Sequence, residues 1–279
     1  MILKAIKTSQ QFVKEDASAH WYGVQPDGTI VSRHDADLRV ARKERLYPSP
    51  TTIEKDIRAN PSLSRWIKNE VAKAFVNNPR LPEENDDVYA ARVLQVADSR
   101  RDHAATRGTA IHKAIENEGT DDPVILPFYE AYRPWHEENI ETTVGSEVKM
   151  ADDSIGVAGT TDRVVMHKKH GLLVLDYKTQ QVKDGKASFW ESFPRQLSFY
   201  AGAYYRKHGV LPGIMSVVID SQNPSRPYEK LYTKEQQAHA YREFLCNVWL
   251  WCASKGKDGY WPAGNWLPNF GAKWIDALP

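Results

Sequence analysis

The spacing of apolar and polar residues predicts a core built from short strands. Runs rich in β-branched and apolar residues are separated by turn residues such as Asp152-Asp153, which is the pattern of strands joined by tight connections. Helical segments lie between and around these runs. The combination predicts an α/β fold with a mixed central sheet flanked by helices. The expected strands are residues 144–150, 155–166, 172–175, 214–220 and 228–232.

A long helix is predicted well upstream of the strands, over residues 62–78. Asn60-Pro61-Ser62 is a helix start signal, and Asn78-Pro79 is a stop signal. Apolar residues recur between them at i, i+3 and i+4, which gives the helix one apolar face. The residues on this face are Leu63, Trp66, Ile67, Val71 and Ala74.

Three further helices are expected. The first covers residues 83–118, with a bend or break near Asp102. The second runs from Phe193-Pro194 to Gly209, because proline suits the first helical turn and glycine commonly follows the last. The third is a long closing helix over residues 234–253. The helices at 62–78 and 83–118 predict a helical addition on the N-terminal side of the sheet.

The first fifty residues are predicted to form a small β-rich segment. Residues 21–24 and 29–31 flank the turn signal Pro26-Asp27-Gly28, which is typical of a hairpin. Asp35 is expected to cap a short helix that runs through Arg45. The basic side of this helix is either a solvated face or a patch that contacts phosphates. The basic residues are Arg39, Arg42, Lys43 and Arg45.

Composition limits the classes of function. The chain has 279 residues, enough for one large domain, and a net charge of +1, so nucleic acid would have to be bound by a locally lined groove. Two cysteines, Cys246 and Cys252, exclude an iron–sulfur cluster held by four thiolates within the chain. No apolar run has the length of a membrane span, and we expect a cytoplasmic protein that does not bind membranes.

The candidate chemistry lies around residues 145–179. Asp176 and Lys178 end an apolar strand and project from the same side, whereas Tyr177 points the other way. Asp176 and Asp162 offer the carboxylates that Mg²⁺ prefers, and Glu147 is a third donor, directly or through water. Lys178 would orient or deprotonate an attacking water and stabilise charge on a phosphorane-like transition state. The alternative is a hairpin with solvated charges at its strand ends.

These residues resemble the core of PD-(D/E)xK nucleases, specifically the RecB-like branch. Glu147, the segment Gly159-Thr160-Thr161-Asp162 and the segment Leu175-Asp176-Tyr177-Lys178-Thr179 match the core motifs. Arg107-Gly108-Thr109-Ala110-Ile111-His112 resembles the G-x-x-x-H helix of that branch, and Gln196-Leu197-Ser198-Phe199-Tyr200 resembles its Q-x-x-x-Y helix. The resemblance implies a restriction-endonuclease-like fold and metal-dependent phosphodiester hydrolysis that leaves a 5′-phosphate.

The resemblance also implies roles for side chains outside the carboxylate pair. His112 would join the metal site as a ligand, and the carbonyl of Tyr177 would be a further ligand. Because imidazole is a better ligand for manganese than for magnesium, good activity with Mn²⁺ as well as Mg²⁺ is expected. Gln196 and Tyr200 would orient the scissile phosphate or brace the lysine. Their neighbours in the motifs, Arg107 and Thr179, complete the expected substrate-binding set.

A looser likeness concerns the N-terminal third. The segment Tyr47-Pro48-Ser49-Pro50-Thr51-Thr52-Ile53 resembles a P-S-x-T-x-I segment of the mitochondrial genome maintenance exonucleases and their phage-encoded relatives. Leu63-Ser64-Arg65-Trp66 matches the L-x-x-W feature that follows it in those proteins. This likeness implies that the helical region helps to form a channel for single-stranded nucleic acid. The hydroxyls of the segment would also cap the next helix.

Three regions are therefore expected: residues 1–103, a β-hairpin and helical region; 104–255, the nuclease core; and 256–279, an aromatic-rich tail packed on the core.

The favoured function is a divalent-metal-dependent DNA exonuclease acting on single-stranded ends in replication, recombination or repair, in a bacterium or phage-infected cell, with a possible partner protein. The alternatives are an endonuclease built on the same core, for restriction or branched-DNA cleavage, and a DNA-binding protein without catalytic activity.

Overall fold

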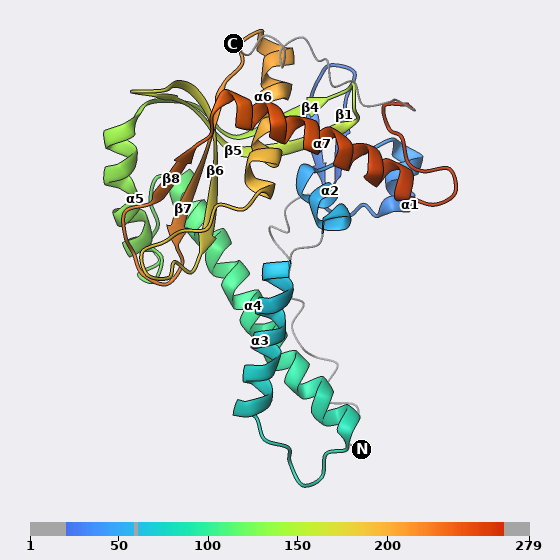
Figure 1. The fold of residues 1–279 in the computed structure, drawn as a ribbon, viewed down its shortest axis with the longest axis vertical. Coiled ribbons are helices and arrows are strands. Elements are labelled where there is room, and N and C mark those ends of the chain that lie inside the picture. Colours follow the sequence, from blue (N-terminus) through green and yellow to red (C-terminus); the bar gives the residue numbers. More distant parts are fainter. Residues whose placement is uncertain (1–20, 59–60, 265–279) are drawn as a thin grey trace.

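The computed structural model describes residues 21–58 and 61–264 and confirms the mixed α/β architecture (Figure 1). Its centre is a five-stranded sheet with the order β4-β5-β6-β7-β8. Neighbouring strands are antiparallel except for β6 and β7, which are parallel and are joined by a helical crossover. The strands are β4 (Ile140–Asp152), β5 (Val157–His167), β6 (Gly171–Gln180), β7 (Gly213–Asp220) and β8 (Tyr228–Leu231).

Helices cover both faces of this sheet. On one face, α6 (Ser192–His208) and α7 (Lys234–Ser254) pack on a cluster that includes Val174. On the other, the C-terminal part of α4 and all of α5 (Leu126–Asn139) pack on Leu173 and Leu175. The alternation of Leu173, Val174 and Leu175 between two cores explains why β6 is apolar throughout, since both of its faces are buried. Each such side chain contributes about 1.5–3 kcal/mol through burial.

The ends of the crossover helix were correctly predicted. Gly209 adopts the left-handed conformation at φ 74°, and its amide donates to the carbonyl of Tyr205, which closes α6. Helix α7 begins at a capping box in which Thr233 and Gln236 exchange side-chain and backbone hydrogen bonds. The last two strands and α7 also agree with the expected ranges to within two residues.

The N-terminal segment forms a second, three-stranded sheet with the order β2-β1-β3. The predicted hairpin is present, but Asp37, not Asp35, caps α1 by accepting from the amide of Val40. Asp35 instead pairs with Arg33. Ser49 caps α2, as its place before a proline predicted. The elements are β1 (Trp21–Val24), β2 (Ile30–Arg33), α1 (Leu38–Glu44), β3 (Tyr47–Pro48) and α2 (Pro50–Ile57).

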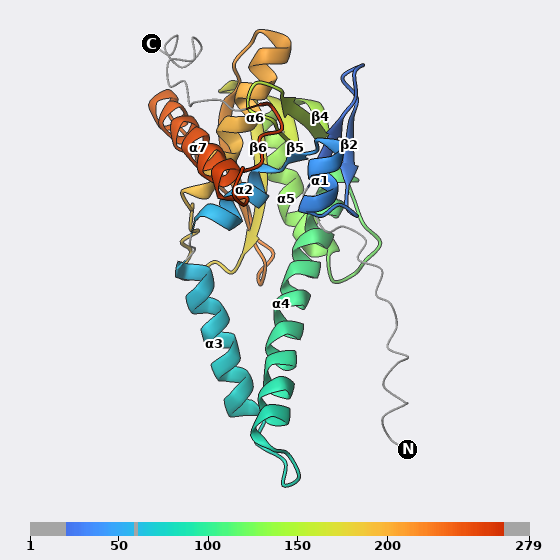
Figure 2. The same cartoon turned by 90° about the vertical axis from the view of Figure 1, so that its right-hand side faces the viewer.

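Helices α3 (Pro61–Asn77) and α4 (Asp86–Glu116) form an arm that projects from the body, and α4 continues from the arm into the core (Figure 2). The expected break near Asp102 is wrong, because α4 is continuous over 31 residues. No proline or glycine precedes Gly108 in this helix, and Asn85 caps its start. A single helix thus joins the tip of the arm to the sheet.

The apolar face predicted for α3 is only partly buried. Ala74 packs with Val93 and Ala97 of α4 in a small core, whereas Trp66 and Ile67 are 37% and 39% exposed. The reason is geometric, since α3 packs on one neighbouring helix and cannot bury a wide face. The side chain of Leu63 lies outside the described residues.

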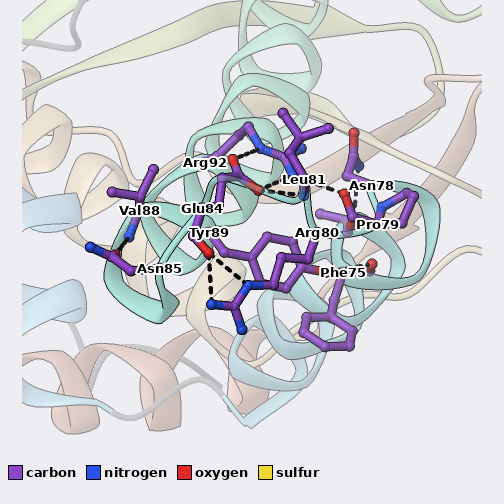
Figure 3. A network of polar contacts seen from close by, with 11 residues as sticks. Phe75, Asn78, Pro79, Arg80, Leu81, Glu84, Asn85, Val88, Tyr89 and Arg92 are labelled. Atoms are coloured by element: carbon purple, nitrogen blue, oxygen red, sulfur yellow. Dashed lines mark hydrogen bonds and ion pairs between the residues drawn. The ribbon is translucent and has the colours of Figure 1, made fainter.

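The turn at the tip of the arm is held by a polar network centred on Glu84 (Figure 3). Arg92 donates to both carboxylate oxygens of Glu84, at 2.6 and 2.8 Å. Arg80 donates twice to the Glu84 carbonyl, and the amide of Leu81 donates to its carboxylate. The connection between α3 and α4 is therefore fixed by hydrogen bonds and not by an apolar core.

The C-terminal end of the described chain packs on the body. Tyr260 is buried against Trp21 and Trp251, and its hydroxyl donates to the carbonyls of Ala41 and Leu46. Trp261 of the expected tail packs near Trp249, with the ring centroids 6.2 Å apart. Trp266, Phe270 and Trp274 lie outside the described residues. Among the helices that are described, none combines the length and the apolar character needed to cross a membrane.

Candidate active site

The predicted catalytic residues meet where β5 and β6 lie side by side and α4 crosses them. Asp162 lies on β5, Asp176 and Lys178 lie on β6, and His112 is in the last two turns of α4. A cleft of about 10 Å³, close to the volume that one water needs, is lined by His112, Ile115, Glu116, Glu147, Asp162, Arg163 and Tyr177. Residues separated by up to 65 positions in the sequence therefore share one small site.

Asp162 is fixed in place by the neighbouring strand. Its Oδ2 accepts a hydrogen bond of 2.5 Å from the backbone amide of Tyr177 and lies 3.9 Å from Nδ1 of His112. Burial raises the pKa of Asp162, although Lys178 and the Tyr177 amide oppose the shift. A carboxylate with this orientation and a raised pKa is poised to accept a cation.

Asp176 and Lys178 form the closest charged pair of the site. The Nζ of Lys178 lies 2.8 Å from Oδ1 and 2.7 Å from Oδ2 of Asp176. Burial raises the pKa of Asp176 to about 6, with Lys178 lowering it and Asp162 raising it further. Burial lowers the pKa of Lys178, but the charges of Asp176 and Asp162 outweigh this and raise it overall. Lys178 is therefore an ammonium at neutral pH and supplies charge, not a free base.

His112 faces the same charges from α4. Partial burial, together with the nearby Lys178 ammonium, lowers the pKa of His112 to about 4. The imidazole is therefore neutral at pH 7, which leaves a nitrogen lone pair for a ligand. Its ring also packs edge-on against Tyr177, with the centroids 6.3 Å apart.

Glu147 reaches the cleft from an irregular part of β4. The residue has φ 47°, and the register of β4 against β5 shifts between Thr143 and Gly145. Bulges of this kind re-aim side chains near functional sites. The exposed side chain of Glu147 lines the cleft together with Asp162 and His112. The structure thus places the three predicted carboxylates on the neighbouring strands β4, β5 and β6.

Tyr177 points away from Asp176 and Lys178, as alternation predicted. Its ring is buried against α5, and its hydroxyl hydrogen-bonds that of Tyr132 at 2.8 Å. The backbone group that contacts the site is the Tyr177 amide, which binds Asp162. A ligand role for the Tyr177 carbonyl stays a prediction.

Gln196 and Tyr200 lie behind Lys178 on α6. The Nζ of Lys178 donates to Oε1 of Gln196 at 3.3 Å, and the ammonium lies 5.6 Å from the centre of the Phe193 ring. Tyr200 is 2% exposed and hydrogen-bonds Gln196. Of the two roles expected for this pair, the contacts support bracing of the lysine. Contact of Tyr200 with the substrate stays a prediction.

Arg107 and Thr179 mark the place where α4 crosses β6. A Cβ on Gly108 would lie 2.6 Å from Oγ1 of Thr179, so glycine permits this close approach. The guanidinium of Arg107 donates to the carbonyl of Ser221, which follows β7. Arg107 is thus engaged in holding α4 to the sheet, and a phosphate contact by Arg107 or Thr179 stays a prediction.

Two residues of the site were not found from the sequence. Arg163 is 2% exposed, donates to the carbonyl of Ile115 at 2.6 Å and contacts His136, so it ties α4 and α5 to β5. Tyr22 of β1 is buried, and its hydroxyl lies 3.2 Å from that of Thr160, two residues before Asp162. Neither belongs to a motif, and only the fold places them here.

The donors suit a hard divalent cation, although the side chains are not gathered into a cage. Among the described residues, no three His, Cys, Asp or Glu side chains are grouped closely enough to hold a metal ion. Asp176 is buried and Asp162 is half-buried, however, and burial raises the pKa of both carboxyl groups. Two such carboxylates, one of them paired with Lys178, fit a site that is stabilised by binding a cation.

Comparison with known families identifies this arrangement. The family model of the PD-(D/E)XK nuclease superfamily matches residues 121–263. The chain belongs to this superfamily. The matched region contains Glu147, Asp162, Asp176 and Lys178, whereas His112 lies outside it. A comparison with curated proteins found no match. PD-(D/E)XK nucleases generally use divalent metal ions such as Mg²⁺, in agreement with the carboxylate pair.

Proposed function

We propose that this PD-(D/E)XK nuclease is a divalent-metal-dependent DNA exonuclease that acts on single-stranded ends. One observation carries the proposal: Asp162, Asp176 and Lys178 converge at the adjoining strands β5 and β6. His112 and Glu147 line the same cleft as Asp162. The function belongs to DNA replication, recombination or repair in the cytoplasm of a bacterium or phage-infected cell, alongside a replication or recombination partner.

Asp162 and Asp176 would hold the metal ion, with His112 and Glu147 as further donors. When bound, the ion would acidify a water and neutralise charge on the phosphate. Lys178 holds a proton and places its ammonium beside Asp176, where it stabilises negative charge that develops on the phosphoryl oxygens. Gln196 and Tyr200 keep this ammonium from rotating away. The products would carry a 5′-phosphate.

Two features support an exonuclease of the RecB-like branch. The R-G-T-x-x-H residues of α4 and the Q-x-x-x-Y residues of α6 flank the carboxylates, as their likeness to that branch implies. The N-terminal segment that resembles the mitochondrial and phage exonucleases lies beside the same strands, since a Cβ on Gly159 would lie 2.9 Å from Pro50. The likeness to those exonucleases favours single-stranded ends as the substrate.

Cleavage of linear and covalently closed circular single-stranded DNA tests this function. Each form is incubated with Mg²⁺, with Mn²⁺ and with EDTA. We expect the linear form alone to disappear, in either metal and not in EDTA, with Mn²⁺ supporting strong activity because imidazole is a better ligand for manganese than for magnesium. Labelled ends would then give the direction of digestion.

Each of the other possible results would indicate a different function for this protein. Cleavage of the circle identifies an endonuclease. Equal binding of both forms without cleavage in any metal identifies a DNA-binding protein that has kept the nuclease fold. Degradation of an RNA strand in place of DNA would contradict the proposed substrate.

A further inference from the structure

A groove of about 390 Å³ is lined in part by the β4 residues that follow Glu147, which itself lines the catalytic cleft. Its walls come from three elements: the β1–β2 hairpin, the end of β4 and the C-terminal turns of α6. Val148 and Lys149, the two residues that follow Glu147 on β4, line its near end. The groove therefore starts within about two residues, or about 7 Å, of a catalytic carboxylate.

The floor of the groove is apolar. Val24 and Ile30 of the hairpin, Val148 and Met150 of β4, and Ala203 of α6 line it. None of them offers a side-chain hydrogen bond. A floor of this kind accepts a flat apolar surface, such as the face of a nucleobase, without a penalty for unpaired polar groups.

The acidic residues at the rim of the groove are already paired, and the charged side chains that are left there are basic. The carboxylate of Asp152 is paired with Arg206 at 2.7 Å, and Asp153 hydrogen-bonds the hydroxyl of Tyr47. Lys149 and Lys207 line the groove and are exposed, and no ion pair of either lysine is found within the described part of the chain. Two ammonium groups are therefore available to bind an anion such as a phosphate.

One wall also carries an aromatic surface. The rings of Tyr204 and His208, one turn apart on α6, are stacked with their centroids 4.3 Å apart and their planes at 34°. Both line the groove, and Tyr204 is half-buried, which restricts its motion. Stacking of a base on an aromatic side chain stabilises the binding of single strands and does not depend on sequence.

We propose that this groove binds the nucleotides of single-stranded DNA that lie next to the scissile phosphate. A base would rest on the apolar floor against Tyr204, and the adjoining phosphates would be met by Lys149 and Lys207. The groove is large enough for about one nucleotide. This inference rests on the proposed nuclease function and adds to it a subsite that holds the strand while its end is cleaved.

Measuring DNA binding in the absence of cleavage tests the subsite separately from catalysis. Fluorescence anisotropy would measure the Kd of labelled oligothymidylates of about 4 and about 16 nucleotides. The protein is the full chain carrying Asp176→Asn, in EDTA. Adding Lys149→Ala and Lys207→Ala should weaken binding of the longer strand by roughly tenfold and reduce the slope of log K against log salt by roughly 1.4. The shorter strand should be weakened by a similar factor, because about four nucleotides are enough to reach from the cleft into the groove.

A matched control removes the same charge elsewhere. Lys169→Ala with Lys257→Ala takes away two exposed lysines, one in the β5–β6 turn and one after α7, and should leave both affinities unchanged. A strand with 5-iododeoxyuridine at successive positions should crosslink to the peptide containing Tyr204 from one position near the cleaved end. Tyr204→Phe should retain affinity, and Tyr204→Leu should lose it.

The outcomes separate the subsite from the nuclease function. Equal loss of affinity in the groove variant and in the matched control would overturn the subsite and leave general charge as the cause. Unchanged affinity in the groove variant would also overturn the subsite, provided that the unmodified protein cleaves DNA. If the groove variant instead changed the oligomeric state, the groove would be a protein interface. Absence of both DNA binding and cleavage in the unmodified protein would overturn the proposed function itself.

Discussion

The contact between Lys178 and Asp176 makes the sharpest prediction at the scale of single residues. Lys178→Met removes the ammonium that lies 2.7 Å from Asp176, and Asp176→Asn removes a donor for the cation. Each should lower the rate of DNA cleavage by on the order of 10²–10³-fold or more, because preorganised charge is the main source of stabilisation in such sites. Initial rates on end-labelled single strands measure the loss, and circular dichroism checks the fold. A rate near that of the wild type in either variant would remove these residues from the mechanism.

A second prediction concerns a buried ion pair outside the site. Arg195 is 4% exposed and donates from Nε to both oxygens of Glu54, at 3.0 and 3.1 Å. Arg195→Met leaves the buried carboxylate uncompensated and should lower the free energy of unfolding by about 3 kcal/mol or more. Arg133→Met, which breaks an exposed pair with Glu137, should change it by less than about 0.5 kcal/mol. Urea denaturation compares the two variants, and equal effects would contradict the argument.

Single residues also show how far the site could be predicted from the sequence. Asp176 and Lys178 were placed on one side of a strand by alternation alone, and they are found in contact. Arg163 could not be predicted in this way, because its partners are backbone and side-chain groups of two distant helices. Tyr200 was expected from its motif either to orient the scissile phosphate or to brace the lysine, and only the structure shows that it is buried and hydrogen-bonded to Gln196. Periodicity predicts the face of a residue, whereas packing between elements decides what it touches.

The distance between α4 and β6 gives a prediction at the scale of elements. Gly108→Ala would place a Cβ 2.6 Å from Oγ1 of Thr179, and the strain should lower the free energy of unfolding by about 1–3 kcal/mol. In a Thr179→Ala background that oxygen is absent and the Cβ of residue 179 is 3.8 Å away. There the same change should raise stability by up to about 1 kcal/mol, since alanine favours a helix. Thermal unfolding of the four proteins tests this change of sign, and destabilisation by Gly108→Ala in both backgrounds would refute it.

The arm provides a prediction that depends on pH. Hydrogen bonds from Arg92 and from the amide of Leu81 lower the pKa of Glu84 from 4.5 to about 2. A lowered pKa in the folded state contributes stability above the unfolded value, and this is lost as the pH falls from about 4.5 to about 2. Hydrogen exchange at the α3–α4 turn, corrected for intrinsic rates, should show less protection in Glu84→Gln than in the wild type at pH 7. The difference should shrink at pH 3, and a constant difference would exclude ionisation of Glu84 as its cause.

Elements differ in how well the sequence predicted them. The strands and α6 were found because turn residues bound them, and Gly209 ends α6 where expected. Helix α5 was not predicted, although Phe128, Tyr132 and Trp135 follow a helical period, because Pro134 within it argues against a helix. The break expected near Asp102 is absent because α4 continues across a region that contains no helix-breaking residue. Packing against the sheet therefore outweighs Pro134 in α5, whereas the continuity of α4 agrees with its own sequence.

At the scale of the whole molecule, the N-terminal sheet and the C-terminal segment close around the same core. The Tyr260 hydroxyl binds the carbonyls of Ala41 and Leu46, and its ring packs on Trp21 and Trp251. Trp251 in turn donates to Asp56 of α2. The N-terminal elements are thus fixed to α7 and, through Tyr22 and Thr160, to the strand that carries Asp162. The catalytic strands are therefore supported from both ends of the described chain.

Metal binding should make the stability of the whole molecule depend on the cation. Asp176 is buried and Asp162 is half-buried, and burial raises both pKa values, so the metal-free fold bears an electrostatic cost that a bound cation relieves. A ligand that binds only the folded state stabilises it by about 1.4 kcal/mol at ten times its Kd, which corresponds to roughly 3–5 °C in Tm. Differential scanning calorimetry should show such a rise with Mn²⁺ and its reversal by EDTA. The double variant Asp162→Asn, Asp176→Asn should have a Tm that is independent of Mn²⁺, and an equal rise in that variant would place the metal elsewhere.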